Sequence, residues 1–294
     1  MEEEYKNKIS YSQYSLWSQC PHRWKVIYID KKRIDEPGIE LIFGSAIHHT
    51  LQAYLTALYS NGVKFADSME LKDILREYMG NEYRKLKEIY GESLDNKITK
   101  NDMLKFYYDG IKILDGFLKH RRDYFNYRDE ELIGVEVPIE YSLRENLNFV
   151  AYLDVVLRNK VTGKIRIVDF KTSRRGWKYQ KNDENKTSQL VIYKSFYSEK
   201  FKVDLKDIDV EFIILKRELY EDSPYPQKRI QRFVPASGKP TVNKTIQNFN
   251  RFLNTCFDSV GNCVSGIVYP KIATENNCRY CEFNQVPELC DKKN

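Results

Sequence analysis

The stretch Ile167-Val168-Asp169-Phe170-Lys171-Thr172-Ser173 is the most informative part of the chain for its fold. It has the composition of a short buried strand that carries a carboxylate and an ammonium group. Side chains two residues apart leave the same face of a strand, so Asp169 and Lys171 should project together. A charge inside a buried strand is costly unless it is paired or bound to a metal. We therefore expect a functional site on this strand.

A second charged residue interrupts an apolar run upstream. Asp154 lies within Phe149-Val150-Ala151-Tyr152-Leu153-Asp154-Val155-Val156-Leu157, which also predicts a strand. Carboxylate oxygens are preferred ligands of Mg²⁺ and Mn²⁺. Together, Asp154 and Asp169 predict a hard-cation site beside Lys171.

The pattern of apolar residues predicts a mixed α/β fold. Residues 10–30 favour a short helix and 43–60 an amphipathic helix that ends at Asn61-Gly62. Further helices are expected over residues 68–89, 101–125, 186–200 and 239–258. Strands are expected over residues 132–143, 147–158, 164–171, 208–216 and, as an edge strand, 228–234.

Composition excludes a membrane-spanning or disordered chain. The 294 residues are 41% hydrophobic and 31% charged, and no apolar run approaches the roughly 18 residues of a membrane helix. Residues 1–6 are acidic, without the apolar core of a signal peptide, so a cytoplasmic location and no membrane partner are expected.

The net charge of +6 is weak evidence for a nucleic-acid partner. Arg174 and Arg175, directly after the strand with Asp169, are the basic residues we expect to contact phosphate.

Four short motifs occur in a fixed order along the chain. They are Gly44-Ser45-Ala46-Ile47-His48, Ala151-Tyr152-Leu153-Asp154, Asp169-Phe170-Lys171-Thr172-Ser173 and Gln189-Leu190-Val191-Ile192-Tyr193. Their order and spacing resemble the PD-(D/E)XK nuclease superfamily, and in particular its RecB-like branch, which includes CRISPR-adaptation-associated exonucleases with iron–sulfur clusters. Ala151 departs mildly from the glycine usual in the second motif.

The resemblance implies a restriction-endonuclease-like core of order α-β-β-β-α-β. One nuclease domain would span residues 1–294, with residues 62–130 as a helical insertion. It implies Mg²⁺ or Mn²⁺ held by His48, Asp154, Asp169 and the Phe170 carbonyl. Lys171 would orient the attacking water or stabilise developing negative charge.

The same resemblance places further residues at the site. Gln189 and Tyr193, four apart on one helix face, would look onto the active site and touch DNA or orient Lys171. Alternatively, Gln189 is a polar group that caps a helix and Tyr193 is a tyrosine packed in the core. The alternative for His48 is a partly buried structural histidine. Glu136 would contact the metal or support the site, or is a surface strand charge.

Six cysteines suggest a metal rather than disulfides in a cytosolic chain. Cys278-Arg279-Tyr280-Cys281 is a C-x-x-C knuckle, and Cys290 follows after eight residues. By resemblance, Cys20 in the segment Ser15–Trp24 would complete a 4Fe–4S cluster and join the two ends of the chain. The gap before Cys290 is longer than the branch pattern, so Zn²⁺ stays an alternative, as do unligated cysteines. Cys256 and Cys263 fall outside the pattern.

The expected function is hydrolysis of DNA phosphodiester bonds by a metal-dependent deoxyribonuclease, an exonuclease in DNA recombination, repair or CRISPR or phage DNA processing. The alternatives are a structure-selective endonuclease, a catalytically weak DNA-binding subunit and an RNA-processing protein. The sequence has no G-x-x-x-x-G-K-[S/T] segment, so a helicase motor or recombination protein would be a separate partner.

Overall fold

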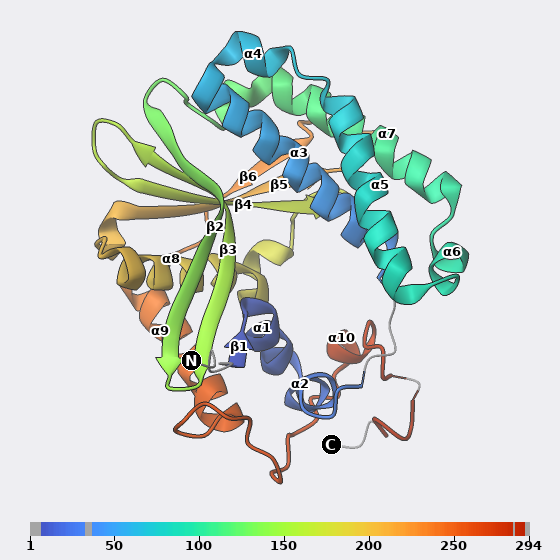
Figure 1. The fold of residues 1–294 in the computed structure, drawn as a ribbon, viewed down its shortest axis with the longest axis vertical. Helices are drawn as coiled ribbons and strands as arrows, with labels where there is room; N and C mark the ends of the chain where they lie inside the picture. The colour runs from blue at the N-terminus through green and yellow to red at the C-terminus, as the bar shows by residue number, and fades with distance from the viewer. Residues whose placement is uncertain (1–6, 33–36, 285, 292–294) are drawn as a thin grey trace, which may run out of the picture.

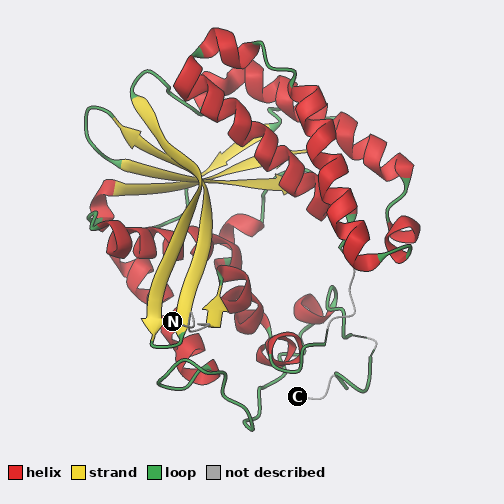
Figure 2. Ribbon diagram, viewed as in Figure 1, coloured by secondary structure: helices red, strands yellow, loops and turns green. Residues whose placement is uncertain are grey.

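The computed structural model describes residues 7–32, 37–284 and 286–291. Six strands form one sheet with helices on both faces, as Figure 2 shows. Along the chain, helix α3 (Ile39–Asn61) precedes strands β2 (Glu130–Arg144), β3 (Leu147–Asn159) and β4 (Ile165–Ser173). Helix α8 (Glu184–Phe201) and strand β5 (Ile208–Lys216) follow. The remaining strands are β1 (Asn7–Ile9) and β6 (Ile230–Phe233).

The sheet has the order β1-β3-β4-β5-β6, with β2 on the other edge of β3. β4 runs parallel to β5 along its whole length, whereas it pairs with β3 only over Val155–Arg158. β1 pairs in parallel with residues 147–149 of β3. Both strands pair with the same edge of β3. Between them, residues 150–154 of β3 have no strand partner on that edge in the described part of the chain. Asp154 lies at the point where β3 and β4 part.

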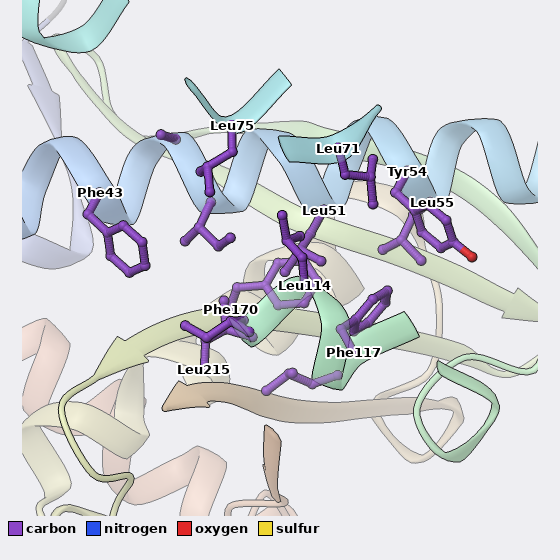
Figure 3. Close-up of a cluster of buried hydrophobic side chains, with 14 of the residues drawn as sticks. Phe43, Leu51, Tyr54, Leu55, Leu71, Leu75, Leu114, Phe117, Phe170 and Leu215 are labelled. Carbon is purple, nitrogen blue, oxygen red and sulfur yellow. The ribbon is translucent and has the colours of Figure 1, made fainter. Parts of the chain in front are cut away.

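One face of the sheet is covered by α3 and by α7 (Lys100–His120), as Figure 1 shows. Between them along the chain, α4 (Val63–Asp67) and α5 (Leu71–Tyr90) pack on α3, and α6 (Ser93–Lys97) packs on α5. Figure 3 shows their core, in which Leu51 of α3 and Leu75 of α5 lie above Phe170 and Leu215 of the sheet. Because Phe170 points into this core, its neighbours Asp169 and Lys171 leave the opposite face of β4.

The opposite face packs against α8, α9 (Lys239–Cys256) and α1 (Tyr11–Gln19). Aromatic residues dominate this second core, in which Phe149 stacks on Phe196 with ring centroids 4.4 Å apart. Tyr14 of α1 makes an edge contact with Phe249 of α9. The first helix is thus fixed to one near the other end of the chain.

Most expected elements are present, with shifted ends. The expectation of one helix over residues 10–30 is wrong: α1 ends at Gln19, and α2 (Pro21–Tyr28) begins after an extended Cys20 with φ −158° and ψ 102°. A residue before proline is disfavoured in the helical region, and proline suits the first helical position. Strand β1 and helices α4, α6 and α10 (Glu275–Cys278) are short elements that the sequence pattern did not predict.

Among the described residues, no helix is both long enough and apolar enough to cross a membrane. Residues 1–6, on which the expectation of no signal peptide rested, lie outside the described part of the chain.

Candidate active site

Two carboxylates meet where β3 and β4 separate. The last pair of the β3–β4 ladder is Val155 with Val168, so Asp154 and Asp169 are the next residues on each strand. The backbone N–H of Phe170 donates a 2.7 Å hydrogen bond to Asp154 Oδ2. The side chain of Asp154 thus takes the place of a ladder bond at the fork.

Lys171 and α8 contact the second carboxylate. Lys171 Nζ lies 2.7 Å from Asp169 Oδ2, and the amide of Gln189 donates to Asp169 Oδ1 at 3.2 Å. The same amide nitrogen lies 3.0 Å from the hydroxyl of Tyr193. The structure therefore brings Gln189 and Tyr193 onto the face of α8 that adjoins Asp169.

His48 reaches the same place from the other side of the sheet. Its Nδ1 lies 3.5 Å from Asp154 Oδ2, and its ring packs against Phe170 with centroids 5.8 Å apart. Burial, reinforced by the charge of Lys171, lowers the pKa of His48 to about 4. The imidazole is therefore neutral at neutral pH, the form in which histidine binds metals.

Gln52 and Glu136 form a further part of the site. Gln52 follows His48 by one helical turn and is buried; its amide donates to Glu136 Oε1 at 2.6 Å and to the Asp154 carbonyl at 3.2 Å. Glu136 has a left-handed backbone, with φ +48°, where β2 passes Asp154. Sequence reasoning missed Gln52; the available signal was a polar residue four positions after His48 on an otherwise apolar helix face.

Burial raises the pKa values of both aspartates. The pKa of Asp169 is raised to about 6 by burial, and the charge of Lys171 opposes this rise. The pKa of Asp154 is raised to about 6 for the same reasons. Both carboxylates therefore carry an electrostatic cost in their ionised forms that a nearby cation would relieve.

The chemistry of the donors fits a divalent cation. Asp169 Oδ2 and His48 Nε2 are buried atoms to which no hydrogen bond is assigned among the described residues, and Asp169 Oδ2 has Lys171 Nζ as an ion-pair partner at 2.7 Å. In the arrangement of the described side chains, however, no group of three or more His, Cys, Asp or Glu residues stands ready to hold a metal. Asp154 is instead engaged by Phe170 and Asp169 by Lys171 and Gln189.

The cysteines of the expected cluster lie together at the other end of the molecule. One small cavity is lined by Cys20, Cys278, Cys281 and Cys290. His22 Nε2 lies 2.8 Å from the Leu289 carbonyl, and Asn277 donates to the Gln19 carbonyl at 2.8 Å. The two segments are thus packed on each other, but the described residues show no cysteine-ligated knuckle.

Arg174 and Arg175 are both engaged within the protein. Each pairs with Glu218, and Arg175 also lies over the ring of Tyr220. A phosphate contact by either arginine stays a prediction and would require exchange of this carboxylate partner.

Comparison with known proteins places the chain in a family. A solved structure, recorded as a "Putative exonuclease" from Eubacterium rectale, is similar with a TM-score of 0.46 and 13% identity, over 85% of this chain and 80% of that one. No curated protein matches the sequence. The family model of the PD-(D/E)XK nuclease superfamily matches residues 8–286. This chain therefore belongs to the PD-(D/E)XK nuclease superfamily.

Proposed function

We propose that this chain is a divalent-metal-dependent deoxyribonuclease that hydrolyses DNA from strand ends. The observation that carries the proposal is the convergence of Asp154, Asp169 and Lys171 at the fork between β3 and β4. Family membership supports a nuclease. Action from ends follows the RecB-like character of the four motifs and is tested below.

Each side chain has a defined role in the proposed reaction. Asp154 and Asp169 would hold Mg²⁺ or Mn²⁺, with His48 and the Phe170 carbonyl as further ligands. When bound, such a cation supplies Lewis-acid stabilisation of the phosphate and a more acidic water. Lys171, on the same face of β4 as Asp169, would orient the attacking water or stabilise the charge that develops on the phosphate.

The residues around this set act as positioning groups. Gln189 holds one oxygen of Asp169, and the N–H of Phe170 holds one oxygen of Asp154. Partners of this kind fix the direction of the remaining carboxylate oxygens. An imidazole ligand from His48 would favour Mn²⁺ somewhat over Mg²⁺.

The proposal is tested by digesting matched DNA substrates with Mg²⁺, Mn²⁺ or EDTA. Linear strands labelled at either end should be degraded with metal and survive in EDTA, whereas covalently closed circles of the same sequence should survive throughout. Rapid cutting of closed single-stranded circles would favour the structure-selective endonuclease. If wild type and Lys171→Ala degraded DNA equally, the assignment of the active site to Asp154, Asp169 and Lys171 would be wrong.

We further propose that Cys20, Cys278, Cys281 and Cys290 hold one metal centre, a 4Fe–4S cluster or alternatively Zn²⁺. Their common cavity supports this proposal, because four thiolates are the usual donor set of both centres. The side chains would have to move, since the described cysteines are not arranged around a metal. Analysis of iron, sulfide and zinc in protein purified without air identifies the metal.

The RecB-like branch, the cytoplasmic location and a separate helicase or recombination partner stay predictions, as do the single domain over residues 1–294 and its helical insertion over residues 62–130.

A further inference from the structure

Two open hollows beside the candidate active site share the same pair of aromatic rings. His49 of α3 and Tyr78 of α5 line both hollows. Their ring centroids lie 5.2 Å apart, and the ring planes meet at 29°, so the rings are stacked. Both side chains are partly exposed. The His49–Tyr78 pair therefore presents flat aromatic surface at the boundary of two hollows.

The first hollow extends from this pair to residues that adjoin Asp154. It has a volume of about 410 Å³, and its lining includes Gln52, Val135 and Glu136. Gln52 hydrogen-bonds both Glu136 and the carbonyl of Asp154. His49 itself directly follows His48, whose ring lies against Asp154. If a DNA strand has a phosphate at the two aspartates, a neighbouring nucleotide of that strand would therefore lie next to this hollow.

The second hollow continues along α5 away from the carboxylates. Its volume is about 430 Å³, and besides the aromatic pair it is lined by Asn81, Glu82, Arg84, Lys85 and Glu88. The two basic residues are balanced by two acidic ones, and Lys85 pairs with Glu82 at 2.8 Å. This balance does not suit a phosphate, which requires net positive charge. It suits a neutral, flat and polarisable group.

A nucleobase is such a group, and aromatic side chains are the usual platforms on which unpaired bases stack. We propose that the His49–Tyr78 pair is a stacking site for an unpaired base of the DNA strand whose phosphodiester lies at Asp154 and Asp169. The inference rests on the proposed nuclease function and adds a substrate class to it: strands with single-stranded ends. Base pairing would keep the base inside the duplex and away from the rings.

A larger cavity lies away from the residues of α8 that contact Asp169. It has a volume of about 690 Å³ and is lined by Trp17, Ser188, Val191 and residues of α9. Gln189 and Tyr193, the α8 residues at the carboxylates, do not line it. It therefore provides the alternative contact site against which the proposal is tested.

The test is photo-cross-linking of single-stranded oligonucleotides that carry one 5-iodouracil, moved one position at a time. Ca²⁺ replaces Mg²⁺ and Mn²⁺ to slow hydrolysis. Cross-links mapped to Tyr78 or His49, from one or two adjacent positions, are expected. Cross-links that map instead to Trp17 or another distant aromatic residue, with none at the pair, would overturn the proposal.

Variants give a second readout through the dissociation constant for the same oligonucleotides. Tyr78→Leu keeps an apolar side chain against the core but removes the ring, and should weaken binding about 5-fold to 100-fold. Tyr78→Phe keeps the ring and should bind like wild type. Tyr108→Leu, at an exposed tyrosine of α7, is the matched control. If Tyr78→Leu fails to fold, the dissociation constant of His49→Leu for the same oligonucleotides tests the proposal instead.

The failure of this inference differs from the failure of the proposed function. Wild type that cleaves DNA, together with unchanged binding by folded Tyr78→Leu and no cross-link at the pair, overturns the stacking site alone. Wild type that cleaves nothing but shows the Tyr78-dependent cross-link overturns the nuclease function and leaves the base site. Equal loss of affinity for blunt duplex and single strands would also contradict the proposal, because a paired base cannot reach the rings.

Discussion

The backbone N–H of Phe170 donates a 2.7 Å hydrogen bond to the carboxylate of Asp154. This bond crosses the fork between β3 and β4, from the second residue beyond their ladder on β4 to the first on β3. It satisfies a buried donor that has lost its strand partner and fixes the direction of one carboxylate oxygen. The aspartate thus closes the end of the ladder and faces Asp169 at the same time.

Removal of the central charged groups should abolish DNA cleavage. Asp154→Ala, Asp169→Ala and Lys171→Ala are each expected to lower kcat by about 10²-fold or more, because each removes a proposed metal ligand or the group proposed to stabilise charge. Cleavage of end-labelled DNA under single-turnover conditions measures the effect. Lys64→Ala, on α4, is the charge control, and a similar loss in this variant would indicate a nonspecific effect.

His48→Ala should change the metal requirement more than the maximal rate. The buried Nε2 without a partner is the expected ligand atom, and loss of one such ligand should raise the half-saturating Mn²⁺ concentration by about 10-fold or more. Titration of cleavage against Mn²⁺ and Mg²⁺ measures this shift. His120→Ala, at the end of α7, should leave both titrations unchanged. An unchanged Mn²⁺ titration for His48→Ala would exclude His48 as a ligand.

The contribution of Asp169 to the stability of the metal-free protein should fall as the pH rises from about 4 to about 6. Burial raises the pKa of Asp169 from 3.8 to about 6, so in this window the folded state holds a proton that the unfolded chain has lost. Asp169→Asn removes the buried charge and should raise the free energy of unfolding at pH 7.5 by about 1–3 kcal/mol. Below about pH 4 the gain should disappear.

This prediction is measured by urea denaturation in EDTA at pH 4 and pH 7.5. Asp115→Asn, at an exposed position of α7, should have little effect at either pH. A loss of stability at pH 7.5 in Asp169→Asn would show that the pair with Lys171 outweighs the cost of burial.

Substitution of any one of the four clustered cysteines should destabilise the protein more than Cys263→Ser. Cys263 is exposed, whereas metal binding at Cys20, Cys278, Cys281 and Cys290 would contribute directly to folding. Thermal unfolding of protein prepared without air compares the variants, and absorbance near about 400 nm would report an iron–sulfur cluster. A colourless protein that contains one zinc ion per chain would support the metal centre and identify its metal as Zn²⁺. Wild-type stability in all four variants would rule the centre out.

The long elements and the two strand aspartates could be predicted because their signals are local. Apolar periodicity marked α3, and single charges in apolar runs marked β3 and β4. Strand β1 has three residues, too few for a pattern, and its contacts are with distant residues, such as those of β3 with which it pairs.

Other features depend on strand register and helix packing, which the sequence does not encode locally. The contact of Gln52 with Glu136 joins residues that are 84 positions apart and arises only when α3 crosses the β2–β3 pair. The stacking of His49 on Tyr78 likewise requires α5 to lie along α3. These two contacts, as distinct from the residues that make them, could not be predicted from the sequence.

The packing of α2 against the segment that ends at Cys290 has a consequence for biosynthesis. His22 and Leu289, whose contact joins them, are 267 positions apart. At about 5–20 residues per second, a ribosome needs about 13–50 s to travel between them. Throughout this time the nascent helices near Cys20 are without their final neighbours. The contact between α2 and the segment that ends at Cys290 therefore forms late in translation. A chaperone that holds the early helices would have tens of seconds in which to act.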